Sequence, residues 1–241
     1  MASNPAPTSP SAGQRGRPLT VLVVDDQPLM SGALKTLIGS AQHMECVGVA
    51  ANGEEAVEAC IAVRPDVVLM DMQMPVMGGV EATARITEAC PDTRVLAITT
   101  FTSEQYLVPA LRAGAAGYLL KDAEPTVILG AIWGVHRGES VLAPAVTAKL
   151  LASIEHERPV VGRAQLKPGD PDGSDLTPRE LDILQLLARG RSNPEIAQAL
   201  SLSESTVKAN LTRIMDKLEV RDRVQVIIRA AQLGLVTLSL D

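Results

Sequence analysis

The sequence predicts two domains: an α/β doubly wound domain with a five-stranded parallel sheet, and an all-α domain of four helices that contains a helix-turn-helix. Two observations carry this prediction. Over residues 19–140, five short apolar runs alternate with longer amphipathic stretches, which is the pattern of repeated β-α units. From residue 176 onward the chain has helical periodicity, and a polar stretch rich in proline and glycine separates the two parts.

The N-terminal end of the chain differs in composition from the rest of the sequence. Residues 1–18 are rich in proline, serine and alanine and have no periodicity, so we expect a disordered tail. No apolar run in the 241 residues approaches the ~18 residues of a membrane helix. The N-terminus also lacks the apolar core of a secretory signal. We therefore expect a cytoplasmic protein.

The strands of the first domain come from five apolar runs. Each run is nearly continuous, as expected of parallel strands that helices cover on both faces. The runs are LTVLVV (19–24), ECVGVA (45–50), DVVLM (66–70), RVLAIT (94–99) and AGYLL (116–120). Amphipathic stretches follow them and predict helices near 29–40, 54–63, 79–89, 104–113 and 124–137. The domain is expected to span residues 19–140.

The segment 141–175 is expected to hold a helix and the interdomain linker. The stretch PAVTAKLLASI at 144–154 is amphipathic and predicts the helix. Residues 156–175 contain three prolines and three glycines among polar residues. That composition is typical of a linker.

Four helices are expected in the second domain, over residues 176–241. The first begins with a capping box between Thr177 and Glu180 and ends near Gly190. The second begins at Asn193, which we expect to cap it, with Pro194 at its first turn. The last three helices are expected at 193–200, 204–218 and about 222–233. The tight break between the second and third predicts a helix-turn-helix.

Cysteine, histidine and charge narrow the functional classes. The cysteines (Cys46, Cys60 and Cys90) are far apart and form no CxxC pair, and the three histidines are equally scattered, which argues against a Cys/His metal site. Residues 19–140 hold 7 Lys and Arg against 15 Asp and Glu, whereas residues 175–241 hold 9 of each. An acidic first half and a neutral second half suggest domains with different partners.

Polar side chains stand at the ends of four predicted strands. Asp25 and Asp26 follow the first strand, Asp71 follows the third, Thr99 ends the fourth and Lys121 follows the fifth. Because the carboxyl ends of parallel strands meet at one edge of a doubly wound sheet, we expect these residues to lie together where such folds bind ligands. Adjacent carboxylates are unfavourable unless a cation offsets them. Oxygen ligands without cysteine or histidine favour Mg²⁺.

A metal ion beside a carboxylate, with a lysine and a hydroxyl nearby, suits phosphoryl transfer. The carboxylate can attack phosphorus, while Mg²⁺, Lys121 and Thr99 offset charge on the phosphoryl oxygens. The simpler alternative is three unrelated strand-end aspartates that cap helices. Other phosphate chemistries fit less well: MGGVEA lacks GxGxxG, no GxxxxGK[ST] is present, and Gln73 stands where aspartyl phosphatases have a second aspartate.

Residues 19–140 resemble the receiver domain of a two-component response regulator, which has a flavodoxin-like fold. The resemblance rests on DD at 25–26, DMQMPVMGG at 71–79, ITTF at 98–101 and GYLLKD at 117–122. Residues 175–238 resemble a LuxR-type helix-turn-helix, through LTPRELDILQLLARGRSNPEIAQAL and LSESTVKANLTRIMDKL. The combination resembles the NarL/FixJ family of response regulators.

The resemblance implies a role for each residue of the predicted pocket. Asp71 is expected to be the phosphoacceptor. Asp25 and Asp26 are expected to hold Mg²⁺ together with Asp71 and the backbone carbonyl of Gln73. Lys121 is expected to pair with the phosphoryl group.

The resemblance also implies a switch and a shaped loop. Thr99 is expected to bind the phosphoryl group, and Tyr118 is the aromatic residue expected to move inward when Thr99 does. The loop after the acceptor is expected to be shaped by Pro75, Gly78 and Gly79. Gln73 and Phe101 stand where the family tunes the lifetime of the phosphoryl group.

The predicted helix at 204–218 carries the residues expected to read DNA. Its apolar side chains fall on one face at helical spacing and are expected to pack in the core: Val207, Leu211, Ile214 and Leu218. Lys208, Ala209 and Thr212 lie outside that face, where the family's recognition helix meets base edges; a lysine can bond guanine and a methyl group can meet thymine. Further residues are expected to contact phosphates or to orient the helix: Thr206, Asn210, Arg213 and Arg223.

Charge supports DNA binding only in part. The domain is net neutral, which is weak electrostatics for DNA, but residues 206–223 carry five basic and three acidic groups. The alternative is a helical protein-interaction module. One recognition helix covers a short half-site, so a dimer is expected. The family dimerises this domain through its last helix, and VQVIIRAAQLGL (224–235) is apolar enough to serve.

These features predict a DNA-binding transcriptional response regulator and not an enzyme. The expected partners are a sensor histidine kinase that phosphorylates Asp71, double-stranded DNA, and a second copy of the chain after phosphorylation. Our hypothesis is that the unphosphorylated receiver covers or misplaces the DNA-binding domain and that phosphorylation frees it. Two alternatives remain open: a DNA-binding regulator controlled by a ligand or protein partner independently of phosphorylation, and a phosphate sink or protein-binding module.

Overall fold

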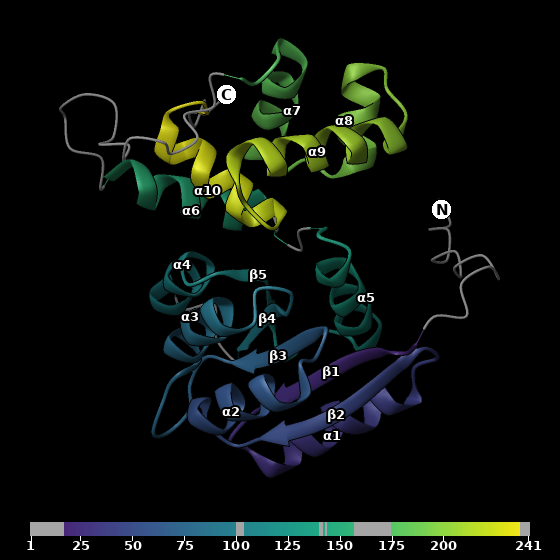
Figure 1. The fold of residues 1–241 in the computed structure, drawn as a ribbon, viewed down its shortest axis with the longest axis vertical. Helices are drawn as coiled ribbons and strands as arrows, with labels where there is room; N and C mark the ends of the chain where they lie inside the picture. The colour runs from purple at the N-terminus through teal and green to yellow at the C-terminus, as the bar shows by residue number, and fades with distance from the viewer. Residues whose placement is uncertain (1–16, 100–103, 140–141, 143, 157–174, 237–241) are drawn as a thin grey trace.

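The computed structural model describes residues 17–99, 104–139, 142, 144–156 and 175–236. Most of the expected N-terminal tail and of the expected linker lies outside these ranges, as does Phe101. The described chain forms two lobes, a sheet with its helices and a group of C-terminal helices. Helix α6 (Pro144–His156) lies between the lobes, next to α10 (Arg223–Leu233) of the C-terminal lobe (Figure 1).

The sheet has five parallel strands in the order β2-β1-β3-β4-β5. The predicted runs all form strands, with bounds that differ from the prediction by no more than one residue at each end. These strands are β1 (Leu19–Val24), β2 (Met44–Ala50), β3 (Val67–Asp71), β4 (Arg94–Thr99) and β5 (Ala115–Leu120). In the register of the sheet Asp71 lies beside Ile98, and Thr99 lies beside Leu120, so the ends of β3, β4 and β5 meet at one edge.

Helices cover both faces of the sheet, which explains why the strands are continuously apolar. Val21 and Val23 of β1 pack in one hydrophobic cluster with α1 (Pro28–Ser40) and α5 (Pro125–His136). Leu22 and Val24 of the same strand pack in the other cluster. That cluster includes α2 (Gly53–Val63), α3 (Gly79–Ala89) and α4 (Glu104–Arg112). The prediction of a doubly wound, flavodoxin-like domain is confirmed.

The C-terminal lobe consists of the four predicted helices. The first three are α7 (Pro178–Ala188), α8 (Asn193–Leu200) and α9 (Glu204–Leu218). The capping box of α7 is present, since Thr177 and Glu180 bond to each other's backbone N–H. The prediction that Asn193 caps α8 is wrong. Ser192 is the cap, because its N–H and hydroxyl both donate to Glu195, while the Asn193 amide oxygen accepts from Arg223.

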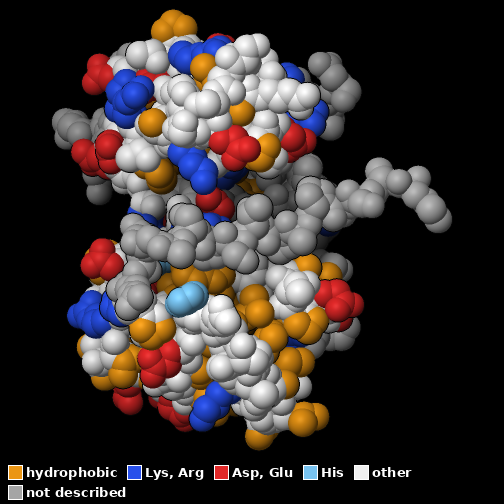
Figure 2. Space-filling model, turned by 90° about the vertical axis from the view of Figure 1, so that its right-hand side faces the viewer, with side chains coloured by type: hydrophobic (Ala, Val, Ile, Leu, Met, Phe, Trp, Pro, Cys, Tyr) orange, Lys and Arg blue, Asp and Glu red, His pale blue; other side chains and the backbone are white. Residues whose placement is uncertain are grey.

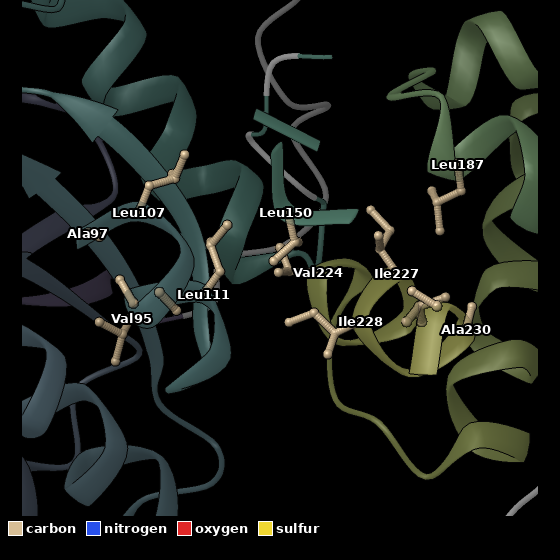
Figure 3. Close-up of a cluster of buried hydrophobic side chains, with 14 of the residues drawn as sticks. Val95, Ala97, Leu107, Leu111, Leu150, Leu187, Val224, Ile227, Ile228 and Ala230 are labelled. Carbon is tan, nitrogen blue, oxygen red and sulfur yellow. The ribbon is translucent and has the colours of Figure 1, made fainter. Parts of the chain in front are cut away.

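The two lobes share one hydrophobic cluster. Figure 3 shows Leu107 and Leu111 of α4 facing Leu150 of α6 and the α10 residues Val224 and Ile228. The helix predicted at 144–154 is present as α6, and it packs between the lobes. Within the described ranges, no helix combines the length and the apolar character that a membrane span requires.

Candidate functional site

The carboxylates predicted to converge do so at the carboxyl edge of the sheet. One oxygen of each of Asp25, Asp26 and Asp71 lies within 4.8 Å of the others. Asp25 and Asp71 are buried, at 2% and 3% exposure, whereas Asp26 is exposed. This asymmetry leaves the cluster open to solvent on the side of Asp26. Three convergent carboxylates are a donor set that suits a hard divalent cation such as Mg²⁺.

Lys121 explains how two buried carboxylates are tolerated side by side. Its ammonium lies 2.6 Å from Asp25 Oδ2 and 2.8 Å from Asp71 Oδ2. All three side chains are almost completely buried. Lys121 reaches this position because its backbone follows β5 directly, where its N–H donates to the Thr99 carbonyl at 2.7 Å. The sequence order of strand ends thus builds the ion triad.

The pKa values in the triad follow from burial and pairing. Burial raises the pKa of Asp71, and the opposing effects of Lys121 and of the Gln73 N–H do not cancel it. Burial also works against the charge of Lys121, but its ion pairs with Asp25 and Asp71 outweigh that effect and raise the pKa of the ammonium. Lys121 is therefore charged at neutral pH.

The loop after Asp71 holds that carboxylate in place. The Gln73 N–H donates to Asp71 Oδ1 at 3.2 Å, and the Gly79 N–H donates to the Met72 carbonyl at 3.2 Å. A Cβ on Gly79 would lie 2.1 Å from the Asp71 carbonyl oxygen, so only glycine fits there. Pro75 is part of the same turn, because its carbonyl accepts from the Met77 N–H at 2.8 Å. Gly78 precedes α3 as its cap.

Thr99 and Tyr118 lie on the neighbouring strands. Thr99 ends β4 and is buried, and Tyr118 of β5 is partly buried with its hydroxyl inside. Tyr118 pairs with Ala97, two residues before Thr99, so Tyr118 and Thr99 lie on the same face of neighbouring strands. Burial raises the pKa of Tyr118, and Thr99 opposes that shift. At the rim, Gln73 Nε2 donates to the Tyr106 hydroxyl of α4 at 3.2 Å. The loop after Asp71 is thereby tied to α4.

The residues predicted to read bases lie on the surface of α9. Lys208, Ala209 and Thr212 are exposed, as is Arg213. Val207, Leu211, Ile214 and Leu218 are buried, as predicted. Lys208 Nζ is 3.1 Å from Glu139 Oε1 of the segment after α5, so this side chain is paired with the first lobe. On the face drawn in Figure 2, basic and acidic side chains are interspersed over both lobes.

All four residues predicted to contact phosphates or to orient the helix form hydrogen bonds within the fold. Asn210 is 7% exposed; its amide donates to the Thr206 carbonyl at 2.8 Å and accepts from Arg213 at 3.2 Å. Arg223 is 8% exposed and donates to Asn193 Oδ1 at 2.7 Å. Burial lowers the pKa of Arg223 to about 10. In this arrangement Asn210 and Arg223 orient helices and are not accessible to a phosphate. Thr206 is exposed and bonds with Ser203.

The structure brings together residues that sequence reasoning missed. Arg221, in the turn before α10, donates to the backbone and side chains of the first lobe. Gln225 donates to the Leu111 carbonyl of α4 at 3.0 Å. Lys217 pairs with Glu180 at 2.7 Å and ties α9 to α7. None of these contacts has a local sequence signal, because each joins residues that lie 37 or more positions apart.

Comparisons with known proteins identify the family of each of the two lobes. Residues 21–132 match the family model described as "Response regulator receiver domain", and residues 174–230 match "Bacterial regulatory proteins, luxR family". The chain is 39% identical over 217 residues to the transcriptional regulatory protein LnrK of Bacillus subtilis (strain 168), covering 90% of this chain and 98% of the relative. It is 38% identical over 208 residues to the nitrate/nitrite response regulator protein NarL of Escherichia coli (strain K12), covering 86% and 93%.

Solved structures give the same result. The signal receiver domain of the response regulator NarL from Mycobacterium tuberculosis is 34% identical, with a TM-score of 0.50, and covers 52% of this chain and 100% of that one. A LuxR-family two-component response regulator from Aurantimonas sp. SI85-9A1 is 28% identical, with a TM-score of 0.52, and covers 58% of this chain and 99% of that one.

Fold, site and matches together define a class of protein: a response regulator that joins a receiver to a LuxR-type DNA-binding domain. Within that class, the chain belongs to the NarL/LuxR family of two-component response regulators. We call the two lobes the receiver and the DNA-binding domain from here on.

Proposed function

We propose that this regulator is switched by phosphorylation of Asp71, and that a sensor histidine kinase is the phosphodonor. The observation that carries the proposal is the buried triad, in which one ammonium bridges Asp25 and Asp71 beside the exposed Asp26. A structural ion pair needs only one carboxylate. A third carboxylate, open to solvent, is what a cation-assisted reaction at Asp71 requires.

In the proposed reaction, a carboxylate oxygen of Asp71 attacks the phosphorus of a phosphohistidine on the kinase. A P–O bond forms, the P–N bond breaks, and the histidine nitrogen leaves with the electron pair. Lys121, already 2.8 Å from Asp71 Oδ2, pairs with the transferred group, and Thr99 donates its hydroxyl to it. The three aspartates and the Gln73 carbonyl would hold Mg²⁺, which would supply positive charge to offset that of the phosphoryl oxygens.

For DNA, we propose that α9 enters the major groove. Lys208, Ala209 and Thr212 then meet base edges, while Thr206 and Arg213 contact phosphates. Support comes from their exposure on one side of a helix whose opposite side is buried in the domain core. Asn210 and Arg223 keep α9 and α10 in position and do not touch DNA.

We further propose that the phosphorylated chain binds DNA as a homodimer formed through α10. One recognition helix covers a short half-site, so two copies are needed for a full operator. All apolar residues of α10 except Leu233 are buried in this chain. A dimer through α10 therefore requires that helix to be uncovered first.

Intact mass after incubation with acetyl phosphate and Mg²⁺ tests the first proposal. Wild-type protein is expected to gain one phosphoryl group, and Asp71→Ala is expected to gain none. Lys121→Met should slow the gain without affecting the fold of the DNA-binding domain. If wild type stays at its original mass under conditions that modify a known receiver, control by phosphate is refuted, and control by a ligand or partner becomes the better hypothesis.

Selection from a random duplex library tests the second. Phosphorylated protein is expected to enrich a two-fold symmetric site. Replacing Lys208 by alanine should weaken binding to that site by about ten- to a hundredfold. Lys35→Ala, an exposed lysine of α1 in the receiver, is the matched control and should leave binding unchanged. Equal binding by Lys208→Ala and wild type would refute the role given to α9.

A further inference from the structure

Arg221 reaches from the DNA-binding domain into the receiver. Its Nη2 donates to Thr87 Oγ1 at 2.9 Å and to the Gly114 carbonyl oxygen at 2.7 Å. Its Nη1 lies 3.5 Å from the Pro91 carbonyl oxygen. These acceptors come from α3, from the segment that follows it, and from the turn before β5. The guanidinium therefore enters a site that three separate segments of the receiver build together.

The site is shaped to admit a guanidinium. Gly114 has φ +107°, a conformation that side chains rarely adopt, and a Cβ there would lie 2.9 Å from Arg221 Nη2. The Arg221 side chain is only 19% exposed. Burial lowers its pKa, Asp222 opposes that effect, and the nearby charge of Arg94 adds to it. Asp222 Oδ2 lies 3.6 Å from Arg221 Nε, so the buried charge has a partner from its own domain.

α10 begins two residues after Arg221 and is covered by α4 of the receiver and by α6. Figure 3 shows Val224 and Ile228 directed toward Leu111 of α4 and Leu150 of α6. Val224 is completely buried, and Ile228 is 6% exposed. The Gln225 side chain adds a hydrogen bond to the Leu111 carbonyl. The apolar face that a dimer through α10 would need is thus occupied within this chain.

The contact between the two domains also includes α9. The pair between Lys208 and Glu139 joins the recognition helix to the segment after α5. A cavity of about 400 Å³ lies at this junction, with Glu204 and Lys208 of α9 on one side and Arg137 and Glu139 on the other. The arrangement therefore engages both the helix that reads DNA and the helix that dimerises.

We propose that Arg221 is the anchor of a closed state, in which its contacts with Thr87, Pro91 and Gly114 hold α10 on the receiver and keep the chain monomeric. The consequence for dimerisation rests on the proposed function of α10. The anchor itself does not, because it is defined by contacts between the two domains. Phosphorylation releases it through α4, which contacts the loop after Asp71 through Tyr106 and contacts α10 through Leu111.

The test removes the anchor in a chain that cannot be phosphorylated. Asp71→Ala is the background, and Arg221→Ala is added to it. Thr87→Val is a second variant, which removes one acceptor hydroxyl from the receiver side with little change in volume. Arg189→Ala is the matched control, because Arg189 is an exposed arginine of the same domain. Circular dichroism and the thermal unfolding of each variant establish that it is folded.

Two readouts separate the anchor from the dimer. Small-angle scattering of the dilute monomer is expected to show a larger radius of gyration for Arg221→Ala, and a smaller change in the same direction for Thr87→Val. Sedimentation is expected to show about a tenfold or greater shift toward dimer for Arg221→Ala, as hydrogen bonds to a charged group would give. Arg189→Ala should match the background in both.

Each outcome decides a different point. Compact scattering in both Arg221→Ala and Thr87→Val overturns the anchor, whatever the state of phosphorylation. Expansion without any dimer supports the anchor and refutes the proposed role of α10 in dimerisation. Expansion with dimer formation supports both. Because Asp71 is absent throughout, a failure of the phosphorylation proposal leaves these results unchanged.

Discussion

Replacing Lys121 by methionine is the sharpest probe of the receiver pocket. Methionine keeps the length of the side chain and removes the charge, so Asp25 and Asp71 are left buried without a cation. Their nearest oxygens lie no more than 4.8 Å apart. Two like charges at that distance repel by roughly 3–4 kcal/mol at an effective dielectric constant of ~20.

Protonation sets a ceiling on this cost. One of the two carboxyls can take up a proton and so remove the repulsion. Protonating a carboxyl of ordinary pKa 3.8 at pH 7 costs about 1.4 kcal/mol for each pH unit between the two values, or ~4 kcal/mol in total. We therefore expect Lys121→Met to lower the free energy of unfolding of the receiver by about 3–4 kcal/mol at pH 7 without Mg²⁺. A carboxyl whose pKa is raised in the folded state favours folding as the pH falls. The difference in the free energy of unfolding between wild type and Lys121→Met should then shrink to roughly 2 kcal/mol at about pH 5.5.

Urea unfolding followed by the fluorescence of Trp133 measures this effect. Trp133 is the single tryptophan of the chain and lies in α5, so it reports on the receiver. Mg²⁺ at a hundredfold excess over its Kd should return ~2.7 kcal/mol. Lys35→Met, on the exposed side of α1, is the control and should change little. A deficit below about 1 kcal/mol at pH 7, or one that does not change with pH, would refute the reasoning.

Three further predictions concern stability and coupling. Gly79→Ala should lower the free energy of unfolding, measured in urea, by at least about 2 kcal/mol, because its Cβ would lie 2.1 Å from the Asp71 carbonyl oxygen. Gly32 has open space around it, so Gly32→Ala should leave the free energy of unfolding unchanged or raise it slightly. Lys217 and Thr177 lower the pKa of Glu180 against the effect of burial, so its contribution to folding is present at neutral pH and is lost as the pH falls below about 4.5. Hydrogen exchange in α7 and α9 should then rise at low pH in wild type and already be high at pH 7 in Glu180→Gln. Tyr106→Phe removes the hydroxyl that accepts from Gln73, and loss of the phosphoryl group, followed by mass, should become faster as the loop loosens.

The fold was predictable from the sequence because its main signals are local. Continuous apolar strands, prolines at helix starts and the Thr177 capping box each depend on a few neighbouring residues. The pocket was predictable for a further reason: strand ends of a parallel sheet meet at one edge, so residues 25, 71 and 121 must converge once the strands are assigned. The prediction that Asn193 caps α8 was wrong because the Asn193 side chain accepts a hydrogen bond from Arg223, thirty residues later.

The contacts between domains were not predictable in the same way. In the sequence Arg221 counted only as one of the five basic residues of 206–223, and no role was predicted for it. Its acceptors, Thr87 and Gly114, lie more than 100 residues away and are a common threonine and a common glycine. Docking of two folded surfaces depends on their shapes, and short stretches of sequence do not encode such shapes. The sequence-based hypothesis could therefore state that the receiver covers or misplaces the DNA-binding domain without saying how.

The position of α4 gives that hypothesis a physical route. α4 carries Tyr106 near the pocket and Leu111 toward the DNA-binding domain, about one and a half turns apart on one helix. A packed interior shifts between discrete arrangements more readily than it deforms, so a movement of the loop after Asp71 that displaces Tyr106 must also move Leu111. Leu111 packs against Val224 and accepts the hydrogen bond from Gln225. A change at the phosphoacceptor therefore reaches α10 through one rigid element, and Arg221 sets how much free energy that movement must supply.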